Sequence, residues 1–265
     1  MCRHLTRSLV SLATLLMACG APDHLASPTA PVDSLSAGAI YVNAMMDIMQ
    51  AHSINRKAIT WNSFRTQVRA GIPAGANVSA TFPAIRVALT LLGDNHSWYT
   101  AADGSGISGS SLICSAPTVM GVPATGADVG YIRVTAFSGT AAQAQAFTDS
   151  IQLAIKAADS GLVRGWIVDL RGNNGGNMWP MIAGIGPILG AGTAGYFIDP
   201  DGAATSWGYS GTASQWNGTV KQVASAPHTL LSSSPRVAVL LDQRVGSSGE
   251  AVAVAFKQRA NTRFF

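Results

Sequence analysis

The alternation of apolar strands with helices after residue 129 constrains the fold of this chain most. The segments 129–137 (VGYIRVTAF), 163–170 (VRGWIVDL) and 235–242 (PRVAVLLD) are apolar and rich in β-branched residues, as buried strands are. Between the first two, residues 138–161 have a polar start and a glycine stop, which predicts a helix, and a second helix follows from residue 247. Strands that are apolar on both faces and alternate with helices predict an α/β fold with a mostly parallel sheet covered by helices.

The segment before this core has helical rather than strand periodicity. Apolar residues at helical spacing predict three helices between about 35 and 93. In the first of them, Ile40, Met45, Ile48 and Met49 are expected to share the buried face. We therefore expect a small helical N-terminal domain over 35–100, followed by an α/β core over 101–265.

The core is expected to contain one further strand at 194–199 and an exposed irregular hairpin at 204–218. The 28 residues of 101–128 are too few for a PDZ domain. The chain stops on ANTRFF, which resembles a strand cut short, so we expect the core to be truncated at its C-terminus.

The N-terminus is typical of an export signal. A basic stretch (MCRHLTR) precedes an apolar run of eleven residues, and the run ends at LMAC, which resembles the lipobox of bacterial lipoproteins. We interpret 1–19 as a signal peptide with lipidation at Cys19 and 20–34 as a flexible tether. The alternative is an ordinary signal peptide cleaved near Ala18 or Ala21. Either predicts an exported protein of the bacterial cell envelope, anchored to the membrane through Cys19 or secreted.

Composition excludes several classes of partner. The formal charge is +4, which falls to +2 once Arg3 and Arg7 leave with the signal, and no basic stripe marks a nucleic-acid surface. No two histidines have metal-ligand spacing, and the glycine turn of the core fits neither a dinucleotide nor a Walker pattern. We expect no metal, no organic cofactor and no nucleic acid.

A serine turn, VGSSGE, follows the strand 235–242 and allows two interpretations. Ser247 and Glu250 match a capping box, in which the hydroxyl and the carboxylate cap the start of a helix. A serine at a strand-to-helix turn is also placed at the carboxyl edge of a parallel sheet, where a nucleophile and free helix amides can meet a substrate. The stretch is not the G-x-S-x-G elbow of α/β-hydrolases.

Two other stretches carry polar chemistry. DLRGNNGG ends a buried strand with Asp169 and Arg171 and continues into a glycine turn that can present backbone amides to a ligand. DNHS places Asp94 and His96 just past a predicted helix end. Each alone has a structural explanation, a plain turn or a surface histidine.

Together, in this order, DNHS, VDLRGNNGG and VGSSGEAVAVAF resemble the tail-specific, or C-terminal-processing, serine peptidases. The resemblance spans about 35–265 and is closest to the Ser–His branch, which includes nisin-resistance-protein-like and tricorn-core-like enzymes. It implies a crotonase/Clp-like core, with Ser247 as nucleophile and His96 as general base. It further implies an oxyanion hole made by the amide of Gly175 or Gly176 and the amide of Ser248. The residues expected to support the site are Asp94, Arg171 and Glu250.

The implied function is a serine endopeptidase that cleaves peptides or protein C-terminal tails in the cell envelope through an acyl-enzyme on Ser247. Other branches use a Ser–Lys pair, but Lys257 is not at a matching position. Two alternatives stay open. The fold can serve a non-catalytic protein that binds peptides or apolar ligands, or the chain can be an inactive truncated remnant.

Overall fold

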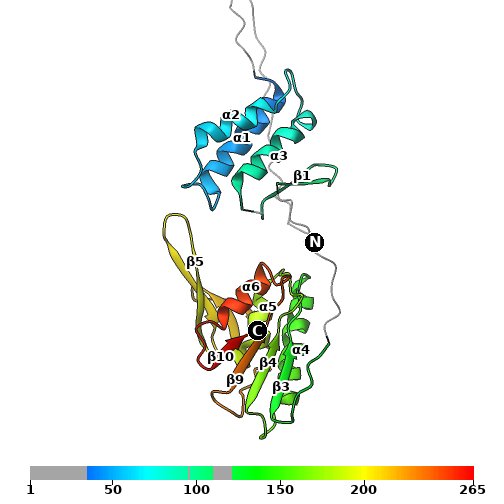
Figure 1. The fold of residues 1–265 in the computed structure, drawn as a ribbon, viewed down its shortest axis with the longest axis vertical. Coiled ribbons are helices and arrows are strands. Elements are labelled where there is room, and N and C mark those ends of the chain that lie inside the picture. The colour runs from blue at the N-terminus through cyan, green and yellow to red at the C-terminus, as the bar shows by residue number, and fades with distance from the viewer. Residues whose placement is uncertain (1–34, 95, 110–120) are drawn as a thin grey trace, which may run out of the picture. The chain divides into compact units, whose positions relative to one another are not determined.

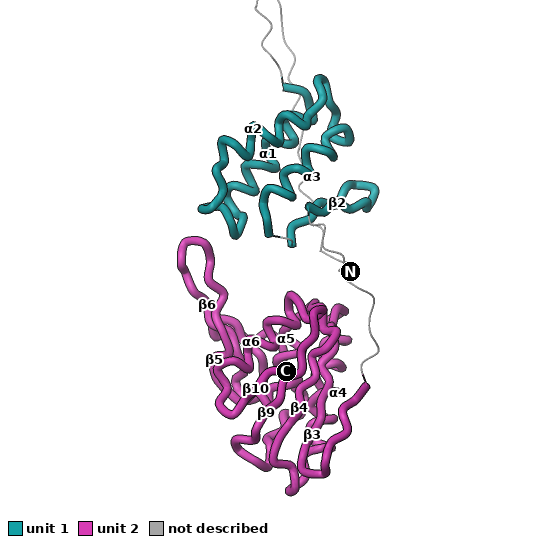
Figure 2. Tube along the Cα trace, in the orientation of Figure 1, with its two compact units in different colours: residues 1–112 teal, residues 113–265 magenta. Residues whose placement is uncertain are grey.

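A computed structural model describes residues 35–94, 96–109 and 121–265. They belong to two compact units, Met1–Leu112 and Ile113–Phe265, which are coloured separately in Figure 2. The predicted signal peptide, Cys19 and the tether 20–34 lie outside the described residues.

Unit 1 contains the three predicted helices, which are confirmed. Its elements are α1 (Ala37–His52), α2 (Trp61–Ala70), the short 3₁₀ turn η1 (Ser79–Thr81), α3 (Phe82–Leu92), β1 (Trp98–Thr100) and β2 (Gly106–Ser108). The antiparallel pairing of β1 with β2 lies partly beyond residue 100, where the sequence places the domain boundary. Ile107 of β2 joins the helical core of this unit.

The buried face of α1 agrees in part with the one predicted: Met45 and Met49 pack against the core as expected, but the two isoleucines do not. Val42 and Met46 are fully buried, whereas Ile40 and Ile48 are 58% and 64% exposed. The cause is the close approach of Gly38 to the 76–77 backbone. Its N–H donates to the Ala76 carbonyl at 2.8 Å, and a Cβ on Gly38 would lie 2.7 Å from that oxygen. This contact turns the helix so that the Gly38 face, not the isoleucine face, meets the core.

Unit 2 is built on the predicted parallel sheet. The strands β3 (Val129–Arg133), β4 (Gly165–Asp169), β9 (Arg236–Leu240) and β10 (Thr262–Phe264) pair in parallel in the order β10-β9-β4-β3 (Figure 1). Three helices accompany them: α4 (Ala141–Ala158), α5 (Met178–Leu189) and α6 (Ser248–Ala255). Helix α5 packs against both α4 and α6. The mixed α/β fold with a parallel sheet is thus confirmed.

A second, antiparallel sheet packs against α5. It consists of β5 (Gly192–Ile198), β6 (Ala204–Tyr209), β7 (Ala213–Trp216) and β8 (Thr219–Val223), in that order, and the β5–β6 hairpin projects from the rest of the unit (Figure 1). The expectation of an exposed, irregular hairpin here is wrong, because Trp207 and Tyr209 are buried. A Cβ on Gly186 of α5 would overlap the Tyr209 ring, so the glycine lets this sheet pack closely on the helix.

Within the described ranges, no helix combines the length and the apolar character needed to cross a bilayer.

Candidate active site

Two of the three sequence motifs meet at the carboxyl edge of the parallel sheet. Strands β4 and β9 are neighbours, and the glycine turn follows the first while the serine turn follows the second. The N–H of Gly246 donates to the carbonyl of Asn173 at 3.1 Å. A Cβ on Gly249 would overlap that same carbonyl, so α6 begins directly against the glycine turn. The sheet therefore joins residues that are about seventy positions apart in the chain.

Ser247 has a backbone conformation that few residues with a side chain adopt. Its φ and ψ are 52° and −125°, and its side chain makes no capping hydrogen bond to α6. The predicted capping box with Glu250 is therefore wrong. An N-cap residue normally has an extended backbone, which directs its hydroxyl to the amides of the first turn, and a positive φ removes that alignment. Glu250 is exposed on the first turn of α6.

Such a conformation costs on the order of 1–3 kcal/mol and persists only where the surroundings impose it. It is the geometry of a nucleophile held on a sharp strand-to-helix turn, although the local sequence differs from the usual elbow. The Ser247 side chain is exposed, and its hydroxyl has no hydrogen-bond partner among the described residues. The serine is thus accessible to a substrate and to a base.

Asn173 shapes the glycine turn and was not singled out from the sequence. Its side chain is fully buried; Nδ2 donates to the Val134 carbonyl at 3.0 Å, and Oδ1 accepts the N–H of Gly175 at 3.0 Å. Gly175 has a φ of 107°, and a Cβ there would lie 2.7 Å from the Cβ of Ser247. The signal available in the sequence was an asparagine inside a glycine turn, where a side-chain amide can replace missing backbone partners.

The candidate oxyanion donors divide into one engaged and two available N–H groups. That of Gly175 is bonded to Asn173. The N–H groups of Gly176 and Ser248 donate to no partner in the part of the chain that the structure describes. The Ser248 hydroxyl donates to the Gly176 carbonyl at 2.5 Å and so ties the two segments together. The Ser248 N–H also belongs to the first turn of α6, where the helix dipole favours negative charge.

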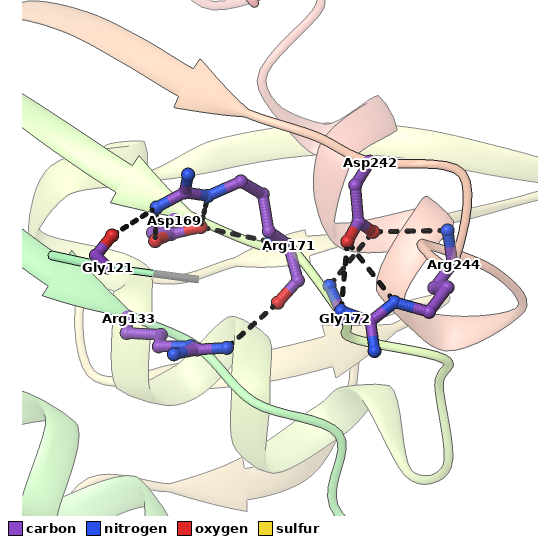
Figure 3. Close-up of polar contacts among 7 residues, drawn as sticks. All are labelled: Gly121, Arg133, Asp169, Arg171, Gly172, Asp242 and Arg244. Carbon is purple, nitrogen blue, oxygen red and sulfur yellow. Dashed lines mark hydrogen bonds and ion pairs between the residues drawn. The ribbon is translucent and has the colours of Figure 1, made fainter. Parts of the chain in front are cut away.

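Arg171 pairs with the aspartate at the end of β4. Its Nε and Nη2 donate to the two carboxylate oxygens of Asp169 at 2.8 and 2.6 Å, and Nη2 also reaches the Gly121 carbonyl (Figure 3). Burial pushes the pKa of Asp169 upward, but hydrogen bonds from Arg171 and the Tyr131 hydroxyl outweigh it and hold that pKa below its ordinary value. The arginine thus stabilises a buried charge beneath the turn.

A second Asp-x-Arg pair follows β9 and holds the start of the glycine turn. Asp242 accepts the N–H of Gly172 at 2.9 Å, and its other oxygen contacts Nη2 of Arg244 at 3.1 Å (Figure 3). The repetition of DLR and DQR at the ends of two neighbouring strands is the sequence signal for this second pair. Both pairs fix the backbone on which the serine and glycine turns meet.

The third motif lies in unit 1. Helix α3 ends at Leu92 and is capped by Gly93, which has a φ of 65°. Asp94 then accepts the N–H groups of His96 and Ser97 at 3.0 and 2.9 Å. The Ser97 hydroxyl donates to the second oxygen at 2.7 Å. Burial raises the pKa of Asp94, but these hydrogen bonds outweigh it and keep the pKa below its usual value. Asp94 thus fixes the backbone at His96, whose side chain is exposed.

Within the described ranges, no three His, Cys, Asp or Glu side chains are grouped so that they could hold a metal ion. What unit 2 does offer is an exposed serine on a strained turn, two available N–H groups beside it and a buried scaffold that holds both. These are the parts of a serine hydrolase that attacks a carbonyl group.

Comparison with known proteins narrows this class. The family model described as peptidase family S41 matches residues 128–264, about half of the chain. The chain therefore belongs to peptidase family S41. The matched span contains both the glycine turn and the serine turn, whereas His96 precedes it.

A curated relative agrees with the family assignment, and solved structures agree with the fold. The nisin-resistance protein of Lactococcus lactis subsp. lactis is 30% identical over 138 residues, which are 50% of this chain and only 40% of that protein. A lipoprotein from Streptococcus agalactiae has a TM-score of 0.61 at 16% identity and covers 89% of this chain and 78% of its own. A candidate peptidase from Parabacteroides merdae has a TM-score of 0.57 at 14% identity, with 87% and 75% covered. These two structures establish the fold alone.

Proposed function

We propose that the chain is a serine endopeptidase that works through an acyl-enzyme on Ser247. The observation that carries the proposal is the strained, exposed serine held against Gly175 at the start of α6. In the first step the Ser247 Oγ bonds to the scissile carbonyl carbon, its proton passes to a base, and the C–N bond breaks as the amine takes that proton. Water then attacks the ester with the same base accepting its proton, which releases the acid and restores the hydroxyl.

The general base in this proposal is His96. A serine hydroxyl is a weak nucleophile until a neighbouring group accepts its proton, and an imidazole is the side chain best suited to this near neutral pH. Two features support the choice: His96 has an exposed side chain, and its backbone is held by the Asp94 carboxylate. Asp94 is thus a positioning residue, because it fixes the backbone at His96 just after the end of helix α3.

The N–H groups of Gly176 and Ser248 would bind the oxyanion. Both are free of partners among the described residues, and the hydrogen bond between the Ser248 hydroxyl and the Gly176 carbonyl keeps their segments together. Loss of one oxyanion donor in a serine peptidase typically raises the barrier by about 2.7–4 kcal/mol. Gly175, whose N–H is bonded to Asn173, serves instead as the contact surface for the serine.

The proposed substrates are peptides or protein C-terminal tails in the cell envelope, with the enzyme anchored through a lipid on Cys19. A relative named for nisin resistance and a structural relative described as a lipoprotein support this assignment. The anchor is tested by cell fractionation of the full-length protein. Wild type should sediment with membranes and Cys19→Ala should be soluble; equal distributions would contradict acylation at this cysteine.

The serine mechanism is tested by labelling the full-length protein with a fluorophosphonate and mapping the modified peptide by mass spectrometry. Wild type should carry the label on Ser247, and both Ser247→Ala and His96→Ala should lose it. Ser248→Ala keeps the Ser247 hydroxyl and is the matched control, which should still be labelled. An unlabelled wild type that still binds peptides or apolar ligands would identify a binding protein on a peptidase fold.

A further inference from the structure

A cluster of aromatic rings around one lysine lies where the antiparallel sheet meets the first turn of α5. The Phe197 ring is stacked on Trp207 with centroids 5.9 Å apart, and it meets the rings of Trp179 and Trp216 edge to face at 6.5 and 6.4 Å. The ammonium of Lys221 lies 5.0 Å from the centroid of Trp216 and 5.9 Å from that of Trp179. We call these five residues, from α5 and all four strands of the second sheet, the aromatic–lysine cluster.

The cluster lies at the protein surface and is only partly buried. Trp207 is buried beneath it, but Phe197 and Trp216 remain 42% and 39% exposed. The indole N–H of Trp216 is already bonded to the Thr205 hydroxyl at 2.9 Å, so its polar group is satisfied and the exposed part of the ring is apolar. Contiguous exposed apolar groups mark interaction sites, and tryptophan is enriched among the residues that carry binding energy.

Lys221 gives the surface a specific charge. Its side chain is exposed, and its ammonium forms no ion pair or hydrogen bond with any other described residue. Two indole faces hold it over an apolar patch, while its three N–H donors stay available. A ligand that binds both the exposed rings and the Lys221 ammonium needs an apolar side chain for the rings and a carboxylate for the ammonium.

The cluster lies close enough to the candidate nucleophile for one short peptide to contact both. Gly175 contacts Ser247, and Trp179 follows Gly175 by four positions, a separation of at most about 14 Å for an extended chain. A peptide whose scissile bond lies at Ser247 therefore needs only a few more residues to reach the rings.

We propose that the aromatic–lysine cluster is a substrate subsite that binds an apolar peptide residue next to a carboxylate. The inference rests on the proposed peptidase function, because its ligand is a segment of the peptide being cleaved. The carboxylate comes either from an acidic side chain or from the free end of the peptide. Both sources offer the same chemistry to Lys221.

The test measures peptide binding without cleavage, in the full-length Ser247→Ala protein, by fluorescence polarisation. Three fluorescein-labelled peptides are compared: Gly-Ser-Ala-Ala-Ala-Phe as free acid, the same peptide as C-terminal amide, and the amide with Glu in place of the last Ala. At least one of the two acidic probes should bind about fivefold more tightly than the plain amide, the size expected for an exposed ion pair. Whichever acidic probe shows the gain identifies the source of the carboxylate.

Substitutions then assign the preference to the cluster. Lys221→Met, which keeps an apolar stem at an exposed position, should abolish the preference for acid, and Lys221→Arg should retain it. Phe197→Ser should weaken all three probes. Lys156→Met, an exposed lysine on α4, and Tyr196→Ser, the exposed neighbour of Phe197 in β5, are the matched controls and should bind as the parent does.

Equal affinity for all three probes, or an acid preference that survives in Lys221→Met, would overturn the proposal. Fluorophosphonate labelling of Ser247 does not depend on peptide binding and keeps the two hypotheses apart. A labelled serine without an acid preference refutes the subsite alone. An acid preference without labelling refutes the peptidase and leaves the subsite standing.

Discussion

Replacing Gly175 by alanine tests whether the glycine turn sets the conformation of the candidate nucleophile. The new Cβ would lie 2.7 Å from the Cβ of Ser247, 2.9 Å from the N atom of Ser248 and 3.0 Å from the carbonyl oxygen of Gly246. Two of these atoms are backbone atoms of the serine turn and the third is the Cβ of Ser247, so a change of side-chain rotamer cannot move any of them aside. The serine turn itself must shift away from the glycine turn.

Two terms set the size of the effect. An L-residue at the φ of 107° found here costs on the order of 1–3 kcal/mol, and overpacking typically adds about 1–3 kcal/mol. We therefore expect Gly175→Ala to lower the free energy of unfolding by about 2–6 kcal/mol, measured by urea denaturation. Because the shift moves the Ser247 hydroxyl relative to the Gly176 N–H on the glycine turn, the rate of fluorophosphonate labelling should fall by at least about tenfold.

Gly211→Ala is the matched control. Gly211 has a similar φ of 97°, but a Cβ there would meet nothing within 4 Å. Gly211→Ala should lower the free energy of unfolding only by the cost of a positive φ, and it should leave the labelling rate of Ser247 unchanged. If Gly175→Ala were labelled as fast as wild type under conditions where it is folded, the contact between the two turns would not be what positions the serine.

Three further predictions concern the scaffold. Arg171→Ala leaves the buried Asp169 carboxylate without its cation, and should lower the free energy of unfolding by about 3–5 kcal/mol in urea titrations. The pKa of Asp169 is lowered on folding, so its contribution is complete above its unfolded pKa of about 3.9 and is lost as the pH falls through the lower folded value. Thermal unfolding followed by circular dichroism should therefore show stability falling below about pH 4, and less steeply in Arg171→Ala. Ser248→Ala removes the hydrogen bond to Gly176 and should lower stability by about 1 kcal/mol in urea, with labelling of Ser247 retained; a complete loss of label would mean that this hydroxyl does more than position the turn.

Three strands of the parallel sheet were predictable because they lie in apolar segments, and a capped helix separates the first two of them. Thr140 and Gln143 form the capping box that starts α4. The meeting of the glycine and serine turns follows from the same pattern, since the carboxyl ends of parallel strands share one edge of the sheet. What could not be predicted depends on contacts between distant residues. The packing of Tyr209 on Gly186 buries the second sheet, and no local pattern in its strands reports that partner.

The φ of Ser247 is also hidden from the sequence, and it decides between the two interpretations of the serine turn. A serine that only capped α6 would have an extended backbone and a hydroxyl bonded to the first helical turn. Here the turn is fixed from outside instead: the Gly246 N–H is held by the Asn173 carbonyl, and α6 starts directly against the same residue. These contacts maintain a strained conformation that leaves the hydroxyl of Ser247 unbonded and exposed. A cap gains nothing from such strain, whereas a nucleophile needs its hydroxyl free and fixed in direction, so the geometry favours attack on a substrate over support of a helix.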